Sequence, residues 1–195
     1  MSERTAVAAR RRDPDARPDQ ILDAAAALLV AEGPAALTME RVARDAGLAK
    51  GTPYLYFPSK TELISALRTR QVRRMLDRCE AATRDAGSAA ESLDLFLTAC
   101  FAATLADAPL LRRLFHAGGT PQTEVAMTRD ALRVHIEAGI AAREFAPADA
   151  EVAATFVVHG MRGVFAEALH APEEKRAEAV AAVRVMAAAI LGTRR

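Results

Sequence analysis

The sequence predicts an all-α protein of about nine helices, with a three-helix N-terminal head followed by a larger helical domain. Apolar residues make up 51% of the 195 residues and aromatic residues only 5%, and the many alanines favour closely packed helices over a sheet. Alternating runs of β-branched residues are almost absent, and glycine and proline gather at a few break points. A chain of this length can form one or two domains with a buried core.

Caps and breakers place the helices along the chain. The first helix is expected to start at Pro18 and to stop at Gly33-Pro34. Ser59 and Glu62 form a capping box for a long helix that reaches about residue 85 and enters the second domain. Similar signals predict further helices over residues 88–107, 110–117, 121–143, 148–169 and 172–191.

Residues 38–57 predict a helix–turn–helix ahead of the long helix. Thr38 can cap its first helix, and Gly47 ends that helix at a position that favours a left-handed residue. Apolar side chains at helical spacing form its buried face: Met39, Val42, Ala43 and Ala46. The second helix is expected to begin near Ala49 or Lys50. Its start carries groups that suit a phosphate-lined groove, namely Lys50, Gly51, Thr52, Tyr54 and Tyr56.

In and after this stretch, a set of residues stands at fixed offsets: Gly47-Leu48, Lys50-Gly51-Thr52, Tyr54, Tyr56-Phe57, Lys60 and Glu62-Leu63. From about Arg17 to Leu67 the chain thereby resembles the DNA-binding segment of the TetR family of transcriptional regulators. Two positions depart from the family pattern. Ala49 replaces the usual Ser or Thr cap, and Pro53 stands where Leu, Ile or Phe is more common. Both affect the start of the second helix, where a proline in the first turn costs little.

The resemblance implies a homodimeric regulator, most often a repressor, that a small-molecule effector releases from a palindromic operator on double-stranded DNA. It implies a DNA-binding domain over residues 15–75 and an effector-binding and dimerisation domain over residues 76–195. A ligand would tilt the long helix and change the separation of the two heads. Residues 1–14 are expected to be a flexible basic arm. A solvated tail is favoured, and an arm whose three arginines, Arg10 to Arg12, touch DNA is the alternative.

Eight residues of the head are predicted DNA contacts: Thr38, Arg41, Lys50, Gly51, Thr52, Tyr54, Tyr56 and Lys60. Thr38 and the two lysines should mainly contact phosphates. Thr52 and the two tyrosines are candidates for base edges, thymine methyl groups or backbone positioning, and the sequence leaves their division open. Tyr54 could equally pack inside the head. Gly51 would let the backbone approach the DNA closely.

Eight residues are predicted to line an effector pocket in the second domain: Phe96, Cys100, Phe101, Phe115, His135, Phe156, His159 and Arg162. The resemblance implies such a pocket among the helices, and the large apolar side chains favour a lipophilic or aromatic effector. The alternative is an ordinary core, which holds for most of these residues. Arg162 could face a ligand carboxylate or a protein carboxylate, and the second is favoured.

The last two helices are rich in small and apolar residues, which suggests a two-fold partner. The resemblance implies a four-helix dimer interface from these helices, and the predicted interface residues are Val157, Gly160, Val164, Ala168, Val183, Ala187 and Ile190. Packing within one chain is the alternative. A dimer would let two recognition helices read successive major grooves ~34 Å apart.

Composition limits the setting but does not by itself indicate DNA. The formal net charge is +1, and residues 1–60 hold nine Lys or Arg against eight Asp or Glu, so the DNA prediction depends on the motif. Cys79 and Cys100 fit no disulfide framework, which favours a reduced, cytoplasmic setting. The first seventeen residues lack the apolar stretch of a signal peptide. No uncharged apolar run approaches the ~20 residues of a membrane span, so we expect no membrane partner.

Catalysis has no support in the sequence. The four histidines lack the spacing of a zinc helix. Glu167 and His170 match half of a di-metal motif whose second half is missing. Nucleotide-binding loops and nucleophile elbows are absent. We therefore expect no enzyme activity, metal or cofactor. A DNA-binding protein with a structural role and no effector ranks behind the regulator, and a helical-bundle metalloenzyme ranks far behind both.

Overall fold

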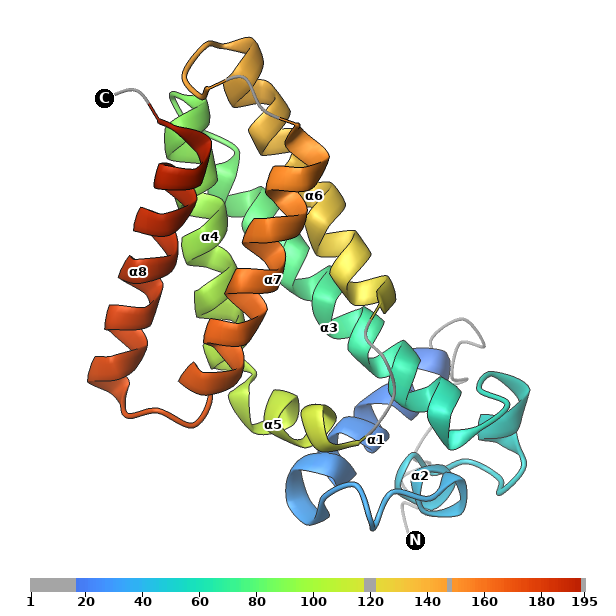
Figure 1. The fold of residues 1–195 in the computed structure, drawn as a ribbon. Helices are drawn as coiled ribbons and strands as arrows, with labels where there is room; N and C mark the ends of the chain where they lie inside the picture. Colours follow the sequence, from blue (N-terminus) through green and yellow to red (C-terminus); the bar gives the residue numbers. More distant parts are fainter. Residues whose placement is uncertain (1–16, 118–121, 147–148, 194–195) are drawn as a thin grey trace, which may run out of the picture. The chain divides into compact units, whose positions relative to one another are not determined.

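The computed structural model describes residues 17–117, 122–146 and 149–193, so the predicted basic arm around Arg10 to Arg12 lies outside the described residues. The described residues form eight α-helices and one short 3₁₀-helix and contain no strand (Figure 1). The all-α prediction is therefore confirmed. The chain divides between Leu63 and Ile64 into two compact units. This division, like the expected boundary after residue 75, falls inside one long helix, α3 (Lys60–Thr83).

The first unit contains α1 (Arg17–Glu32), α2 (Met39–Asp45) and the 3₁₀-helix η2 (Thr52–Leu55). The Thr38 hydroxyl accepts a hydrogen bond from the Arg41 amide at 3.2 Å and caps α2 as expected. Gly47 follows α2 with a φ of 65°, a conformation that glycine adopts without strain. The core contains Ile21, Ala25, Leu29, Leu37, Val42 and Phe57.

The second helix of the helix–turn–helix is shorter than the sequence suggested. Its helical part is a single four-residue 3₁₀ turn, whose N-cap Gly51 has no side chain to bond the free amides. Pro53 stands in this first turn, is buried and has no N–H to donate. The two departures from the family pattern thus coincide with an irregular helix start.

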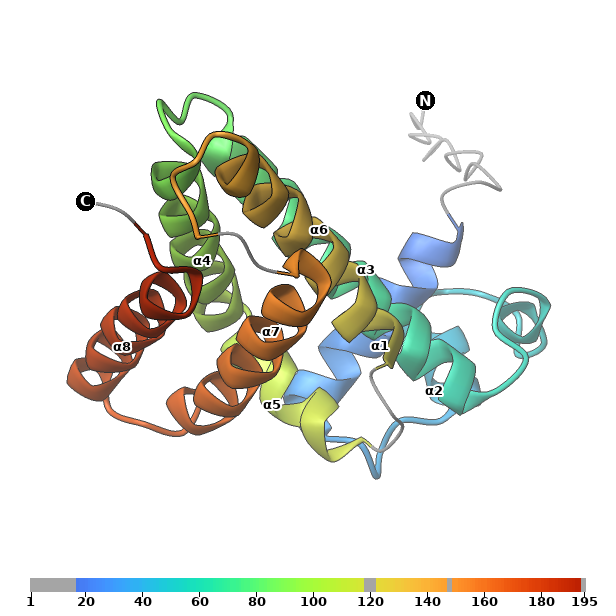
Figure 2. The ribbon, with the colours of Figure 1, turned by 45° about the horizontal axis from the view of Figure 1, so that its top comes forward.

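The second unit contains the rest of α3 together with α4 (Ala89–Ala106), α5 (Ala108–His116), α6 (Gln122–Ala141), α7 (Ala150–Ala168) and α8 (Glu173–Leu191). Helix α6 packs on α4 and α7, and α8 packs on α4 and α7 (Figures 1 and 2). The rings of Phe101 and Phe165 meet edge to face with centroids 4.3 Å apart. Other side chains of this core are Phe96, Leu97, Cys100, Leu132, Ile136, Val158 and Met161.

Helix α4 differs from its neighbours in composition. Over 18 residues it carries only Glu91 and Asp94 as charges, so by length and composition it could also cross a membrane. Its apolar side chains instead form part of the core of the second unit, which is the ordinary reason for such a helix in a globular protein.

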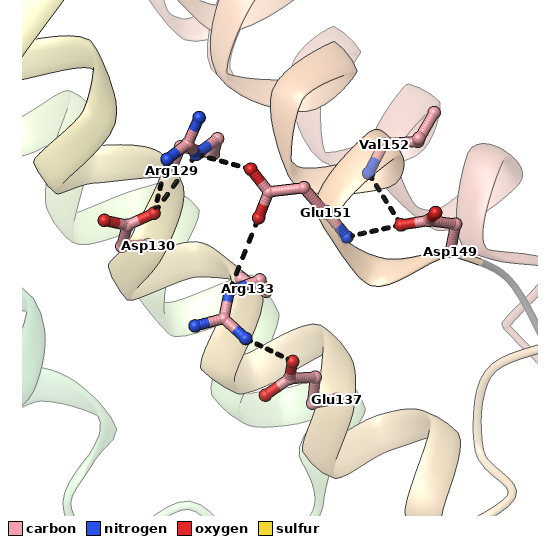
Figure 3. A network of polar contacts seen from close by, with 7 residues as sticks. All are labelled: Arg129, Asp130, Arg133, Glu137, Asp149, Glu151 and Val152. Atoms are coloured by element: carbon pink, nitrogen blue, oxygen red, sulfur yellow. Dashed lines mark hydrogen bonds and ion pairs between the residues drawn. The ribbon is translucent and has the colours of Figure 1, made fainter.

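Charged groups join α6 to the start of α7 (Figure 3). The Glu151 carboxylate pairs with Nε of Arg129 at 3.0 Å and with Nε of Arg133 at 3.5 Å. The Asp149 carboxylate accepts hydrogen bonds from the amides of Glu151 and Val152 at 3.0 and 3.1 Å. The ion pairs are partly exposed and contribute little stability, whereas the cap fixes where α7 begins.

Gly139→Ala is expected to lower the free energy of unfolding by about 2 kcal/mol, because it overpacks the core. A Cβ at Gly139 would overlap the ring of Phe145 and lie 2.8 Å from its Cγ. Urea unfolding at fixed protein concentration measures the change. The matched control is Gly163→Ala, where a Cβ meets nothing within 4 Å and alanine favours the helix. Equal stability of Gly139→Ala and the wild type would contradict the packing described.

Candidate DNA interface, ligand cavity and apolar face

The head carries a polar hollow of about 420 Å³ beside α2. It brings together three predicted DNA contacts, Thr38, Arg41 and Lys50. Arg44, which was not among the predicted contacts, lines the same hollow and bonds Asp45 at 3.0 Å. Its position on the last turn of α2 could have indicated it as a DNA contact. Cationic groups therefore outnumber the one carboxylate of the lining, Glu40.

Two of the predicted DNA contacts also hold the head together. Arg41 bonds both carboxylate oxygens of Glu32, with Nη1 2.7 Å from Oε2. These hydrogen bonds lower the pKa of Glu32 and raise the pKa of Arg41. The Lys60 amine donates to the Pro34 carbonyl at 2.8 Å and so ties the start of α3 to the α1–α2 loop. Both residues have a structural role, and their contact with DNA stays a prediction.

The turn at residues 50–56 presents its side chains to solvent. Lys50 pairs with Glu40 at 3.1 Å, but both side chains are exposed, so a phosphate can replace the carboxylate at little cost. The Tyr54 side chain is 52% exposed, which favours the outward alternative over packing inside the head. Leu55, which was not among the predicted contacts, is 80% exposed on the same turn. Thr52 and Tyr56 are half-buried.

Gly51 has no structural reason to be a glycine within the head. Its φ is −84°, which any residue adopts, and an added Cβ would meet nothing within 4 Å. A glycine on an exposed turn with free space around it suits a close approach by another molecule.

The second unit contains a cavity of about 120 Å³ between α3, α4, α5, α6 and α7. Its apolar walls come from Val72, Met75, Val125, Val158, Met161 and Phe165. Among its polar groups, the Thr104 and Thr128 hydroxyls donate to carbonyls of their own helices at 2.8 and 3.0 Å. Asp107 pairs with Arg78 at 3.5 Å. These three polar residues therefore already have partners.

Gln71, Glu124 and Arg162 supply the remaining polar groups of the cavity. Glu124 is buried and accepts a hydrogen bond from the Thr69 hydroxyl at 3.3 Å. Gln71 is only 7% exposed, and its Oε1 has no hydrogen-bond partner among the described residues. Burial lowers the pKa of Arg162, and the charge of Glu124 partly opposes that effect. A polar side chain buried without a partner is uncommon and requires an explanation.

The structure places few of the predicted pocket residues at this cavity. Arg162 lines it. Phe96, Cys100 and Phe101 are instead buried in the core, which was the alternative to a pocket. Phe156 is 63% exposed and His159 is exposed. The Phe115 side chain lies outside the described part of the chain. Gln71 and Glu124 were not selected because, on a single helix, each looks like any surface residue.

His135 belongs to the core edge and not to the cavity. Its Nδ1 lies 2.9 Å from the Ser92 hydroxyl, and its ring centroid is 4.9 Å from that of Phe96. Burial lowers the pKa of His135, because the charged imidazolium loses solvation there.

The lowered pKa of His135 predicts a pH-dependent stability. The folded state favours neutral imidazole, so the stabilisation is complete above the unfolded pKa of about 6.5 and is lost as the pH falls through the folded value. Urea unfolding at pH 7.5 and pH 5 should show a smaller loss of stability in His135→Asn than in the wild type. An unchanged pH dependence in His135→Asn would contradict this account.

Helices α7 and α8 share an exposed apolar face. A groove of about 120 Å³ runs along it and is lined by Phe156, Val157, Gly160, Met161, Val164, Val183, Met186, Ala187 and Ile190. Phe156 and Met186 are 63% and 60% exposed. The lining includes every predicted interface residue except Ala168, which is buried in the core. Exposed apolar surface of this kind is typical of a protein interface.

Comparison with known proteins gives the class of the head. Residues 21–67 match the family model described as bacterial regulatory proteins, tetR family. The fatty acid metabolism regulator protein of Bacillus subtilis (strain 168) is 30% identical over 88 residues. These residues cover 45% of this chain and 45% of that protein, so the match spans less than half of the relative.

Solved structures extend the likeness over the whole fold. A TetR-family transcriptional regulator from Pectobacterium atrosepticum is similar with a TM-score of 0.74 and 20% identity, over 93% of this chain and 97% of that one. The transcriptional regulator FadR from Bacillus subtilis, in complex with stearoyl-CoA, is similar with a TM-score of 0.71 and 19% identity, over 91% and 99% of the two chains. The helix–turn–helix head thus resembles that of bacterial regulatory proteins, and the second unit has the helical fold of the solved regulators. Residues 21–67 therefore match the TetR family, and the chain shares the fold of solved TetR-family regulators.

Proposed function

We propose that the chain is a cytoplasmic, homodimeric repressor that binds a palindromic operator and is released by a small-molecule effector. The observation that carries DNA binding is the exposed turn at residues 50–56, which follows a capped helix in the segment that matches the family model. Lys50, Gly51, Thr52, Tyr54 and Tyr56 are the proposed contacts of this turn. Thr38, Arg41 and Lys60 would add phosphate contacts beside it.

The groove on α7 and α8 supports the dimer. Two copies that bury this face against each other form an isologous interface, in which the same patch serves both subunits. Such a dimer presents two heads to DNA, so its operator should contain two half-sites related by a two-fold axis. A monomer would have to leave Phe156 and Met186 exposed to water.

The cavity supports effector control, because α3 connects it covalently to the head. Gln71, Val72 and Met75 line the cavity from α3, and the same helix begins at Lys60 in the first unit. A ligand that favours one tilt of α3 would change the separation of the two heads and weaken a fit that both must make together. The similar FadR structure holds a ligand, stearoyl-CoA.

Selection from random-sequence DNA tests the proposed function. The full-length chain, at physiological salt with competitor DNA, should enrich one palindrome with half-sites about one helical turn apart. Enrichment of no sequence would contradict sequence-specific regulation and would favour a structural DNA-binding role.

A further inference from the structure

The cavity in the second unit is small for a ligand site. Its volume of about 120 Å³ is below the roughly 300–1,000 Å³ of pockets for drug-sized ligands. An apolar protein cavity of about 150 Å³ holds one benzene molecule. The site as it stands therefore accepts a molecule of about one six-membered ring, and a ligand as large as stearoyl-CoA would require it to open.

Two polar groups of the lining define what such a molecule must offer. Gln71 Oε1 is buried and has no partner among the described residues, so it requires a hydrogen-bond donor. The Arg162 guanidinium is half-buried at the same cavity, and no hydrogen bond or ion pair joins it to another described residue. It can donate to a ligand oxygen. The other polar groups of the lining already have partners.

We propose that this cavity binds a compact ring compound that carries a neutral hydroxyl group, of which a phenol is the simplest example. The hydroxyl would donate to Gln71 Oε1 and accept from Arg162, while the ring would lie against Met75, Met161 and Phe165. A phenol stays neutral at pH 7, as a tyrosine side chain does. The inference rests on the proposed effector role of the cavity, and it specifies the chemical class of the effector.

Charged ring compounds fit the same lining less well. A carboxylate could accept from Arg162, but it has no proton for Gln71 and would be repelled by the buried Glu124. An ammonium could donate to Gln71, but it would be repelled by Arg162. A ring without a polar group would leave the buried amide oxygen without a partner.

Isothermal titration calorimetry of the full-length chain without DNA tests the inference with four probes of similar size. The probes are 4-methylphenol, p-xylene, benzoate and benzylamine. We expect 4-methylphenol to bind at least tenfold more tightly than p-xylene, and the two charged probes to bind more weakly than 4-methylphenol. Equal affinity for p-xylene, tighter binding of either charged probe, or no binding of 4-methylphenol at millimolar concentration would overturn the inference.

Gln71→Leu should weaken binding of 4-methylphenol about tenfold and leave p-xylene unchanged or tighter. The matched control is Gln122→Leu, the same change at an exposed position of α6 that does not line the cavity. Arg162→Gln is a second variant, at a half-buried position. It should also weaken the binding of 4-methylphenol more than the binding of p-xylene. Wild-type binding of 4-methylphenol by both cavity variants would overturn the inference.

The outcome separates this inference from the proposed function. Binding of 4-methylphenol that depends on Gln71 supports the inference whether or not DNA is released. If the phenol binds and the DNA complex persists, effector control by this class is wrong and the chemistry of the cavity stands. If the chain binds no DNA, the proposed function fails independently of the calorimetry.

Discussion

A chain with both Phe156→Glu and Met186→Glu is expected to be monomeric and to bind its operator at least a hundredfold more weakly. Both side chains line the groove on α7 and α8 and are more than half exposed in the single chain. In a two-fold dimer the variant would bury four carboxylates without partners, and each would cost several kcal/mol. Sedimentation velocity measures the dissociation, and fluorescence anisotropy measures the loss of DNA binding.

The control for the dimer prediction is Val134→Glu. Val134 is 58% exposed, close to the exposure of Met186, but it lies on α6 and does not line the groove. This variant should remain dimeric and bind DNA as the wild type does. A dimeric Phe156→Glu/Met186→Glu chain, with unchanged helix content by circular dichroism, would place the interface elsewhere.

The double variant Lys50→Ala/Tyr54→Ala is expected to bind the operator about a hundredfold more weakly and to fold normally. Both side chains are more than half exposed on the turn at residues 50–56, so their removal should lower the stability of the head only slightly. Two protomers each lose one phosphate contact and one contact to a base or its methyl group, at about 1–3 kcal/mol per base contact. Anisotropy on specific and scrambled DNA separates the two losses.

The salt dependence of DNA binding measures the contribution of the Lys50 phosphate contact separately. The logarithm of the DNA-binding constant decreases linearly with the logarithm of the salt concentration. For Lys50→Ala alone, this slope should be less steep by about two, because each of the two protomers loses one phosphate contact. The control is Lys175→Ala, which removes an exposed lysine from α8 in the second unit. Its slope should equal that of the wild type. A wild-type slope for Lys50→Ala would exclude the proposed phosphate contact.

Much of the fold was predictable because local signals fix the helix ends. The Ser59 hydroxyl accepts from the Glu62 amide at 3.1 Å ahead of α3, as the capping box predicted. Pro172 immediately precedes α8. The turn at residues 50–56 was less predictable, because the sequence suggests a helix from about Lys50 to Phe57, longer than the one turn that forms. Pro53 and the missing cap instead favour one 3₁₀ turn.

The sites differed in how much of each could be predicted from the sequence. The apolar face of α7 and α8 could be predicted from the sequence, because small and apolar residues recur at helical spacing on two adjacent helices. The cavity could not be predicted, since its polar groups come from four helices and each looks ordinary on its own helix. His135 shows the same limit: its partner Ser92 lies 43 positions away, so no local pattern revealed that contact.

An anisotropy titration of the full-length chain on its selected palindrome and on a scrambled duplex is the most direct test of dimeric, sequence-specific regulation. Both titrations would use physiological salt. We expect saturation at two subunits per palindrome, with an affinity at least a thousandfold above that for the scrambled duplex. Equal affinity for the two duplexes, or saturation at one subunit per palindrome, would contradict a dimeric, sequence-specific regulator.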